Sequence, residues 1–171
     1  ERPDALIIAG DVYDRPIPSG EAVGVLNRFL SRAILQLQVP VLMAAGNHDS
    51  RERLSFGSEL LSSAGLHIAG RLSARPRKVI LSDKLGPVHF YLLPYVDPPA
   101  ANSLFPEPPA KTFQEAFDKA AAPILADADF SKRNILICHG TFCRTKQDGV
   151  QAAEESVGGA DLVDLRQYRD F

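Results

Sequence analysis

Three short apolar runs, each followed by a small polar group, limit most strongly what this chain can fold into. The runs are "DALIIA" at 4–9, "VPVLMAA" at 39–45 and "NILIC" at 134–138. Each has the length and the continuous apolar character of a β-strand that is buried on both faces. Strands of this kind alternating with helical patterns are typical of α/β proteins with a largely buried sheet, and we expect that fold class here.

The segments between these runs supply the helical patterns. Apolar residues at helical spacing predict a helix over about 20–37, which Ser19 can cap, and a second helix over about 51–64 that ends before Gly65. The capping box "TFQE" at 112–115 predicts a helix through about 127. Pro123 is expected to bend or divide that helix.

The remaining segments predict strands and connections. "RKVIL" and "VHFYLLPY" have the composition of two strands, separated by the turn-like "SDKLGP". The five prolines of residues 97–111 predict a loop or extended connector outside the core. "DLVDLRQY", close to the end of the sequence, predicts a short helical turn.

Composition excludes several classes of protein. With 171 residues the chain has the size of one domain, and its net charge of −2 indicates no general affinity for phosphate backbones. No apolar run is long enough to span a membrane. The two cysteines, Cys138 and Cys143, predict reduced thiols, since a zinc site would need a fourth ligand beyond these two and His139. A P-loop and a Gly-rich dinucleotide fingerprint are both absent from the sequence.

The polar groups at the strand ends predict a functional site. Asp11, Asn47 and His139 follow the three runs, and they converge if the three strands are parallel neighbours. A carboxylate, an amide oxygen and an imidazole together suit a divalent metal such as Mn²⁺. Taken singly, each residue has a structural explanation as a turn, a cap or a satisfied polar group, and the same explanation is kept for His67 and His89.

Two of these blocks carry a family resemblance. "GDVYD" at 10–14 and "GNHD" at 46–49 resemble signature blocks of the calcineurin-like metallophosphoesterases, and "ILICHG" resembles the later block that contributes one histidine. The segments "GNHDSRERLSFGSELLSSAGLHIAG", "FYLLPYVDPP" and "ESVGGADLVDL" are similar to the SbcD family of bacterial nuclease subunits. The resemblance implies layered sheets flanked by helices.

The resemblance also implies a role for each site residue. Asp11 would bridge two divalent metals, Mn²⁺ or alternatively Mg²⁺, and Asn47 and His139 would bind the second of them. His48 would stabilise the transition state or protonate the leaving oxygen at the scissile phosphate. Asp14 would hydrogen-bond to His48 and keep it charged and oriented.

The SbcD family implies a metal-dependent DNA exonuclease and endonuclease of recombination, repair and replication. Such a protein works in the cytoplasm with an SbcC-type ATPase, acts on double-stranded DNA ends and hairpins, and forms a homodimer. ATP enters only through the partner ATPase. Residues 1–171 are expected to form a single nuclease domain without a cap domain.

The sequence departs from the family pattern at both ends. An early DxH block and a late GHxH block, which supply further metal ligands in the family, do not occur in these 171 residues. We therefore expect a fold that is incomplete at both termini, and a chain that alone binds Mn²⁺ weakly and hydrolyses DNA slowly or not at all.

Two other functions remain open at this point. The signature blocks occur equally in metallophosphodiesterases and phosphatases that act on small molecules or phosphoproteins. The missing terminal blocks would also suit a non-catalytic scaffold with an incomplete metal site. Against the scaffold stands the presence of all five residues expected in the site: Asp11, Asp14, Asn47, His48 and His139.

Overall fold

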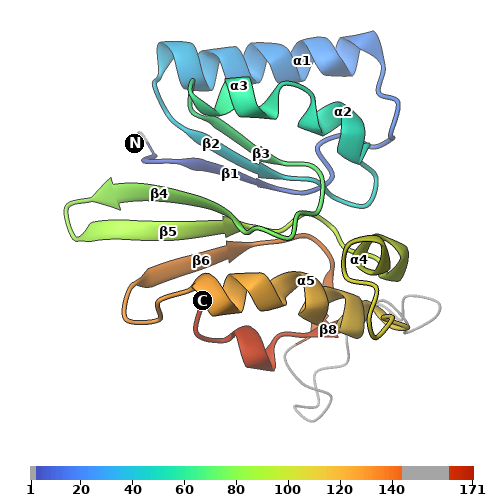
Figure 1. The fold of residues 1–171 in the computed structure, drawn as a ribbon. Coiled ribbons are helices and arrows are strands. Elements are labelled where there is room, and N and C mark those ends of the chain that lie inside the picture. The colour runs from blue at the N-terminus through green and yellow to red at the C-terminus, as the bar shows by residue number, and fades with distance from the viewer. Residues whose placement is uncertain (1–2, 144–161) are drawn as a thin grey trace.

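Two three-stranded sheets stack face to face, and helices cover their outer faces (Figure 1). The computed structural model describes residues 3–143 and 162–171. In the first sheet β1 (Leu6–Ala9), β2 (Val41–Ala44) and β3 (Leu66–Ala69) are parallel. In the second, β5 (Gly86–Leu92) pairs antiparallel with β4 (Arg77–Asp83) and parallel with β6 (Arg133–Ile137). The expected α/β fold with layered sheets flanked by helices is confirmed.

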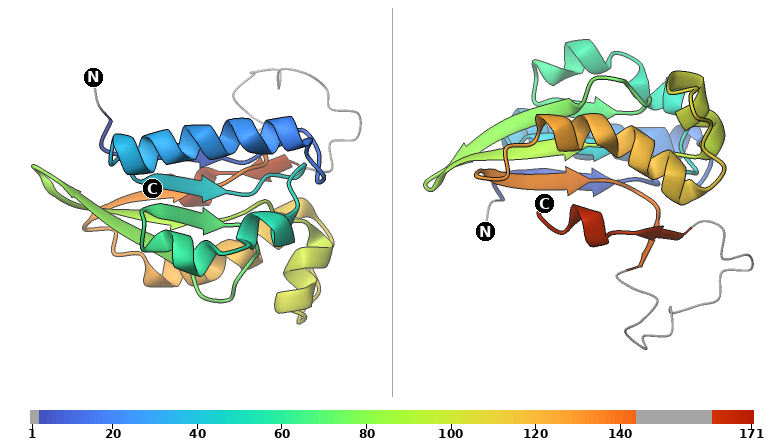
Figure 2. Two further views of the ribbon diagram at one scale, coloured as in Figure 1. Left: turned by 90° about the horizontal axis from the view of Figure 1, so that it is seen from above. Right: turned by 60° about the horizontal axis from the view of Figure 1, so that its bottom comes forward.

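The helices form the two outer layers of the molecule (Figures 1 and 2). The first sheet is covered by α1 (Gly20–Ser31), which continues as a π-helical turn (Arg32–Gln36), and by α2 (Arg51–Ser55) and α3 (Ser58–Ser62). The second sheet is covered by α5 (Phe113–Asp127), and α4 (Pro98–Leu104) packs beside α5 at the end of the sandwich (Figure 1). A small parallel pair, β7 (Thr141–Cys143) with β8 (Leu162–Asp164), precedes a 3₁₀ turn (Arg166–Tyr168).

Local sequence signals account for the starts of the two longest helices. The Ser19 hydroxyl accepts the Ala22 N–H at 3.2 Å and caps α1. At the start of α5, Thr112 and Glu115 form the reciprocal capping box that the sequence predicts. Pro123 lies inside α5 and does not divide it.

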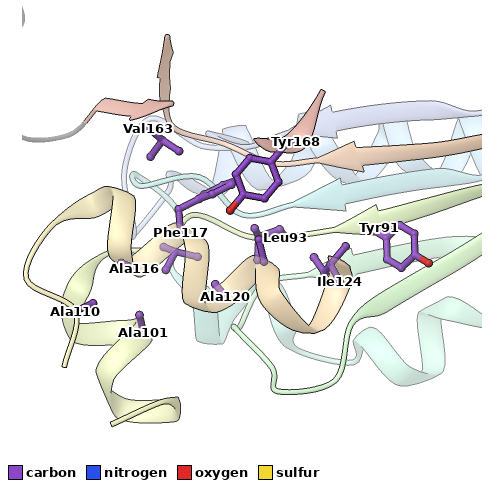
Figure 3. Packing of buried hydrophobic residues seen from close by; sticks show 12 residues of the cluster. Tyr91, Leu93, Ala101, Ala110, Ala116, Phe117, Ala120, Ile124, Val163 and Tyr168 are labelled. Carbon is purple, nitrogen blue, oxygen red and sulfur yellow. The ribbon is translucent and has the colours of Figure 1, made fainter. Parts of the chain in front are cut away.

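The core consists of three apolar layers, one between the sheets and one under each helical layer. Strand β2 contributes to two of them, because Val41 and Met43 face α1 while Leu42 and Ala44 face the second sheet. This central position explains the continuous apolar run of β2, all of which is buried. In the third layer the side chains of α5 pack against the second sheet and the C-terminal turn, with Phe117 against Tyr168 (Figure 3).

Strand β1 departs from the expected burial. The prediction that residues 4–9 are buried on both faces is wrong, because β1 has a neighbour on one side only and Ile7 is 46% exposed. Strand β1 is therefore an edge of the first sheet, and β6 is the corresponding edge of the second.

Three further predictions need correction, and one strand was missed. The helix expected over 51–64 is two short helices, because Phe56 is extended and Gly57 adopts a left-handed φ of 69° between them. Strand β3 was not predicted, since its four residues lie between a helix signal and a turn. The connector 97–111 contains α4, which Asp97 caps and Pro98 begins, and it is not outside the core, since Ala101 and Ala110 are buried there. "DLVDLRQY" begins with β8, so its helical part is limited to the 3₁₀ turn.

Candidate metal centre

The loops that follow β1, β2 and β6 meet at one end of the sandwich, at the right in Figure 1. Strands β1 and β2 are neighbours, but β6 belongs to the other sheet, so the three strands are not parallel neighbours in one sheet as supposed. Their ends meet because the sheets stack with the carboxyl ends of β1 and β6 side by side. His139 Nδ1 lies 2.9 Å from the backbone oxygen of Ala9.

The structure brings together three of the side chains predicted from the sequence. His139 Nε2 lies 3.0 Å from Asn47 Oδ1 and 3.4 Å from Asp11 Oδ2. The other carboxylate oxygen, Asp11 Oδ1, accepts the backbone N–H of His48 at 3.1 Å. The donor atoms of a carboxylate, an amide and an imidazole therefore converge at one point.

The protonation of His139 shows why this point suits a cation. The backbone oxygen of Ala9 can only accept a hydrogen bond, so Nδ1 of His139 carries a proton and donates it. In the neutral imidazole Nε2 then presents a lone pair to two oxygen atoms that also carry lone pairs. A proton or a metal ion between them relieves the repulsion, and a histidine fixed through a backbone carbonyl is a usual metal ligand.

Two glycines create the space in which these ligands approach one another. At Gly10, φ is +86°, and an added Cβ would lie 2.6 Å from the Cβ of His139. At Gly46, an added Cβ would lie 2.9 Å from Cγ of Asp11. Real Cβ atoms do not come so close to other atoms, so both glycines of the "GD" and "GN" pairs are required by packing.

Asp11 has a strained backbone that Asp49 holds in place. Its φ of 47° lies in the left-handed region, which residues other than glycine rarely adopt and which often marks a functional position. The buried carboxylate of Asp49 accepts the next two N–H groups, of Val12 at 3.1 Å and Tyr13 at 3.0 Å, and that of Gly46 at 2.8 Å. Asp49 thus ties the loop after β1 to the loop after β2.

Asp49 is the functional residue that sequence reasoning missed. The available signal was its place as the last residue of "GNHD", where a buried carboxylate needs several donors nearby. The same carboxylate affects Tyr13: burial of the phenol, and next the charge of Asp49, raise the pKa of Tyr13. Asp49 supports the site without being one of the converging donors.

His48 and Asp14 are placed in the same loops but are not joined. The side chain of Asp14 is exposed and its carboxylate lies 3.2 Å from Arg15 Nε. Within residues 3–143 and 162–171, no hydrogen bond connects Asp14 with His48. His48 is exposed beside Asp11, through the backbone hydrogen bond described above.

The cysteines take no part in this site. Both are free thiols, and burial raises the pKa of Cys138 to about 11, so its thiol stays protonated. Among the described residues, no three or more His, Cys, Asp or Glu side chains are grouped to hold a metal. The candidate centre is of another composition, because one of its donors is the amide of Asn47.

None of the described helices combines the length and apolar character needed to cross a bilayer.

Comparison with known proteins agrees with the geometry. The family model described as calcineurin-like phosphoesterase matches residues 1–164. The chain belongs to this family. Calcineurin-like phosphoesterases use divalent metals for hydrolysis, and the converging donor atoms of Asp11, Asn47 and His139 fit such an ion.

Two curated proteins are similar to this chain over its whole length. Both are the SbcD component of the nuclease SbcCD: that of Staphylococcus epidermidis is 32% identical and that of Staphylococcus saprophyticus is 29% identical, and both alignments cover 100% of this chain. The chain spans 44% of the length of each relative. Part of the similar segment "ESVGGADLVDL" lies outside the described residues, which resume at residue 162.

Proposed function

We propose that this chain is the nuclease domain of an SbcD-type protein, which hydrolyses phosphodiester bonds of DNA with divalent metals. The observation that supports this most is the convergence of Asp11, Asn47 and His139 on one point. The names of the two Staphylococcus relatives favour a nuclease over other phosphoesterases. Residues 1–171 would form one domain, with the candidate centre at its edge.

The residues of the candidate centre would have the following roles in hydrolysis. Asp11 would bridge two ions and Asn47 and His139 would bind one of them, while Ala9 holds the His139 ring in the required tautomer. Such a pair of ions, Mn²⁺ or Mg²⁺, supplies activation of water and neutralisation of phosphate charge. Three side chains are fewer ligands than two ions need, so we expect weak metal binding and slow hydrolysis by these 171 residues alone.

His48 would act on the phosphate itself. Its backbone N–H donates to Asp11 and its side chain is exposed, so its imidazole would be available to stabilise developing charge or protonate the leaving oxygen. Asp14 would orient His48. This needs the Asp14 carboxylate to leave Arg15, and ion pairs as exposed as this one contribute little stability.

The name of the relatives also supports a proposal about assembly. We infer an SbcC-type ATPase partner, through which ATP would support the action of the nuclease on double-stranded DNA ends and hairpins, in cytoplasmic recombination, repair and replication. A homodimer is the further expectation. The chain has exposed apolar side chains on α3 and just before it, with Phe56 86% and Leu60 80% exposed, that a second copy could bury.

The proposal is tested by activity on two substrates. The protein is assayed with Mn²⁺ on duplex DNA with free ends and on p-nitrophenyl phosphate, together with His48→Ala and His139→Ala. We expect DNA cleavage that both substitutions abolish, while only His139→Ala also removes binding of Mn²⁺. Hydrolysis of p-nitrophenyl phosphate without DNA cleavage would favour a small-molecule phosphoesterase. Neither activity, with no Mn²⁺ binding, would favour a scaffold.

A further inference from the structure

A cavity lies at the sandwich edge formed by β3 and β4, whereas the candidate metal centre lies beyond the carboxyl ends of β1, β2 and β6. Its volume of about 550 Å³ is in the range of small-molecule sites. Helices α2 and α3, the segment 70–76 and helix α5 form its walls. Gly70 allows this shape, because an added Cβ there would lie 2.8 Å from the backbone oxygen of Arg51 in α2.

The charge of this cavity is positive. Arg71, Arg75 and Arg77 line it, and Glu59 is the carboxylate among the lining residues. Arg71 lies 3.6 Å from Glu52, in a pair that is mostly exposed. Arg75 has no ion-pair partner within the described residues.

Arg77 is the most enclosed of the three arginines. Its side chain is 25% exposed, yet within the described parts of the chain its guanidinium donates no hydrogen bond. Its contact is an ion pair of 3.5 Å with Glu59, whose side chain is 90% exposed. A guanidinium has five N–H donors, so most of the hydrogen-bonding capacity of Arg77 is available to a ligand.

Neutral donors and acceptors surround this guanidinium. His67 lines the same cavity, and burial first and the charge of Arg77 second lower the pKa of His67, which favours the neutral ring. Ser55 and Ser58 also line the cavity. Guanidinium groups together with hydroxyls are the combination that binds phosphate oxygens.

We propose that this cavity binds a phosphate group, with Arg77 and Arg75 as its principal contacts and Glu59 as the group that the phosphate displaces. In the unliganded chain the Glu59 carboxylate lies near Arg77 as a weak substitute for the ligand. The phosphate can belong to a free nucleotide or to the 5′ end of a DNA strand. The proposal is independent of the metal centre, since the two sites share no residue.

The test is calorimetric titration of the purified protein with pyrophosphate and with deoxyadenosine monophosphate, in buffer containing a chelator. We expect Arg77→Gln and Arg75→Gln to weaken binding about tenfold and about threefold, as loss of charge-assisted hydrogen bonds predicts. Glu59→Gln should tighten binding at least about twofold, because the competing carboxylate is removed. Arg28→Gln, on α1 outside the cavity, removes the same charge and should change nothing.

Several outcomes would overturn the proposal. The first is a Kd above about 1 mM for both ligands in the wild-type protein. The second is unchanged affinity in folded Arg75→Gln and Arg77→Gln. The third is a lower affinity in Glu59→Gln. Because Arg75 is exposed, its variant should fold even if Arg77→Gln does not. Binding of oligonucleotides with and without a 5′-phosphate then identifies the source of the phosphate. If the protein binds the 5′-phosphorylated oligonucleotide more tightly and Arg75→Gln abolishes this difference, the ligand is a DNA end. If the two oligonucleotides bind equally, the ligand is a free nucleotide.

Discussion

Asp49 accepts three backbone hydrogen bonds although only 6% of the residue reaches solvent, and two of these bonds follow directly after the strained Asp11. A carboxylate enclosed by N–H donors in this way fixes the backbone conformation around it. The position of Asp11 in the candidate centre therefore depends on a residue that is not one of the converging donors.

Replacing Asp49 by Asn should destabilise the protein and weaken metal binding together. Asn has an NH₂ group in place of one carboxylate oxygen. This donor would face backbone N–H groups that now donate to the carboxylate. We expect the free energy of unfolding, measured by urea denaturation, to fall by about 2–4 kcal/mol. Asp14→Asn, in the same loop but exposed, is the matched control and should leave the urea midpoint unchanged. Equal effects of the two substitutions would contradict this role of Asp49.

Gly46 should tolerate no side chain. In Gly46→Ala the new methyl group overlaps Asp11, so we expect Mn²⁺ affinity to fall about tenfold or more, measured by calorimetry. Gly20→Ala provides the control, since nothing lies within 4 Å of a Cβ at this position at the start of α1. That variant should bind Mn²⁺ normally and unfold at the same or a slightly higher temperature.

Single residues of the site could be predicted from the sequence where strand ends position them. Asp11, Asn47 and His139 were found because each lies within two residues of the end of an apolar run. Asp49 was not, because its importance depends on which N–H groups surround it in the folded chain. The pairing of Asp14 with His48 rests on family resemblance and stays a prediction, since in the structure Asp14 contacts Arg15.

At the scale of elements, helix α5 supports the outer face of the second sheet through core residues such as Phe117 and Ile124 (Figure 3). Its first turn depends on the capping box of Thr112 and Glu115. Elements with such explicit signals were predicted correctly. The break at Gly57 was missed because a single glycine inside a helical pattern is often tolerated, and α4 was missed because prolines at its start resemble a loop signal.

Thr112→Ala should cost about 1 kcal/mol of unfolding free energy, because the Glu115 N–H loses the hydroxyl that it donates to at 3.2 Å. Thr112→Ser retains an acceptor and should restore most of the loss. Thermal unfolding followed by circular dichroism measures both. If the serine variant is as unstable as the alanine variant, the contribution of Thr112 is packing of its methyl group instead of capping.

His67, at the edge strand β3, should make stability depend on pH. Burial first, and the charge of Arg77 second, lower its pKa in the folded state below 6.5. The unfolded chain then binds the proton more readily, so stability from this group is complete above about pH 6.5 and decreases as the pH falls below it. In His67→Gln the urea midpoint should change less between pH 7 and pH 5 than it does in the wild-type protein. An unchanged slope would mean that another group titrates there.

At the scale of the whole molecule, the two sheets and their helices could be predicted only as a class. Apolar periodicity indicates that a strand is buried, but it carries no information on which strand lies beside it. The membership of β6 in the second sheet, and the edge position of β1, follow from pairing between distant segments. The fold class was therefore confirmed while the arrangement around the site needed correction.

Divalent metal should stabilise the whole molecule, because its ligands come from both sheets. An ion that binds the folded state alone raises the unfolding free energy by about 2.7 kcal/mol at one hundred times its Kd, which corresponds to about 5–10 °C in Tm. Differential scanning fluorimetry with Mn²⁺ measures this shift. His139→Ala should remove it, whereas His48→Ala should retain it, and a shift that survives His139→Ala would place the ion elsewhere.

The contact of His139 with the end of β1 has a consequence for the protein while it folds. Two of the three converging side chains are encoded early in the chain and the third follows about ninety residues later. During synthesis, and after damage that separates the layers, the donor set is divided between parts that have not docked. Under the proposed function, hydrolysis at this centre would then require the two sheets to have docked.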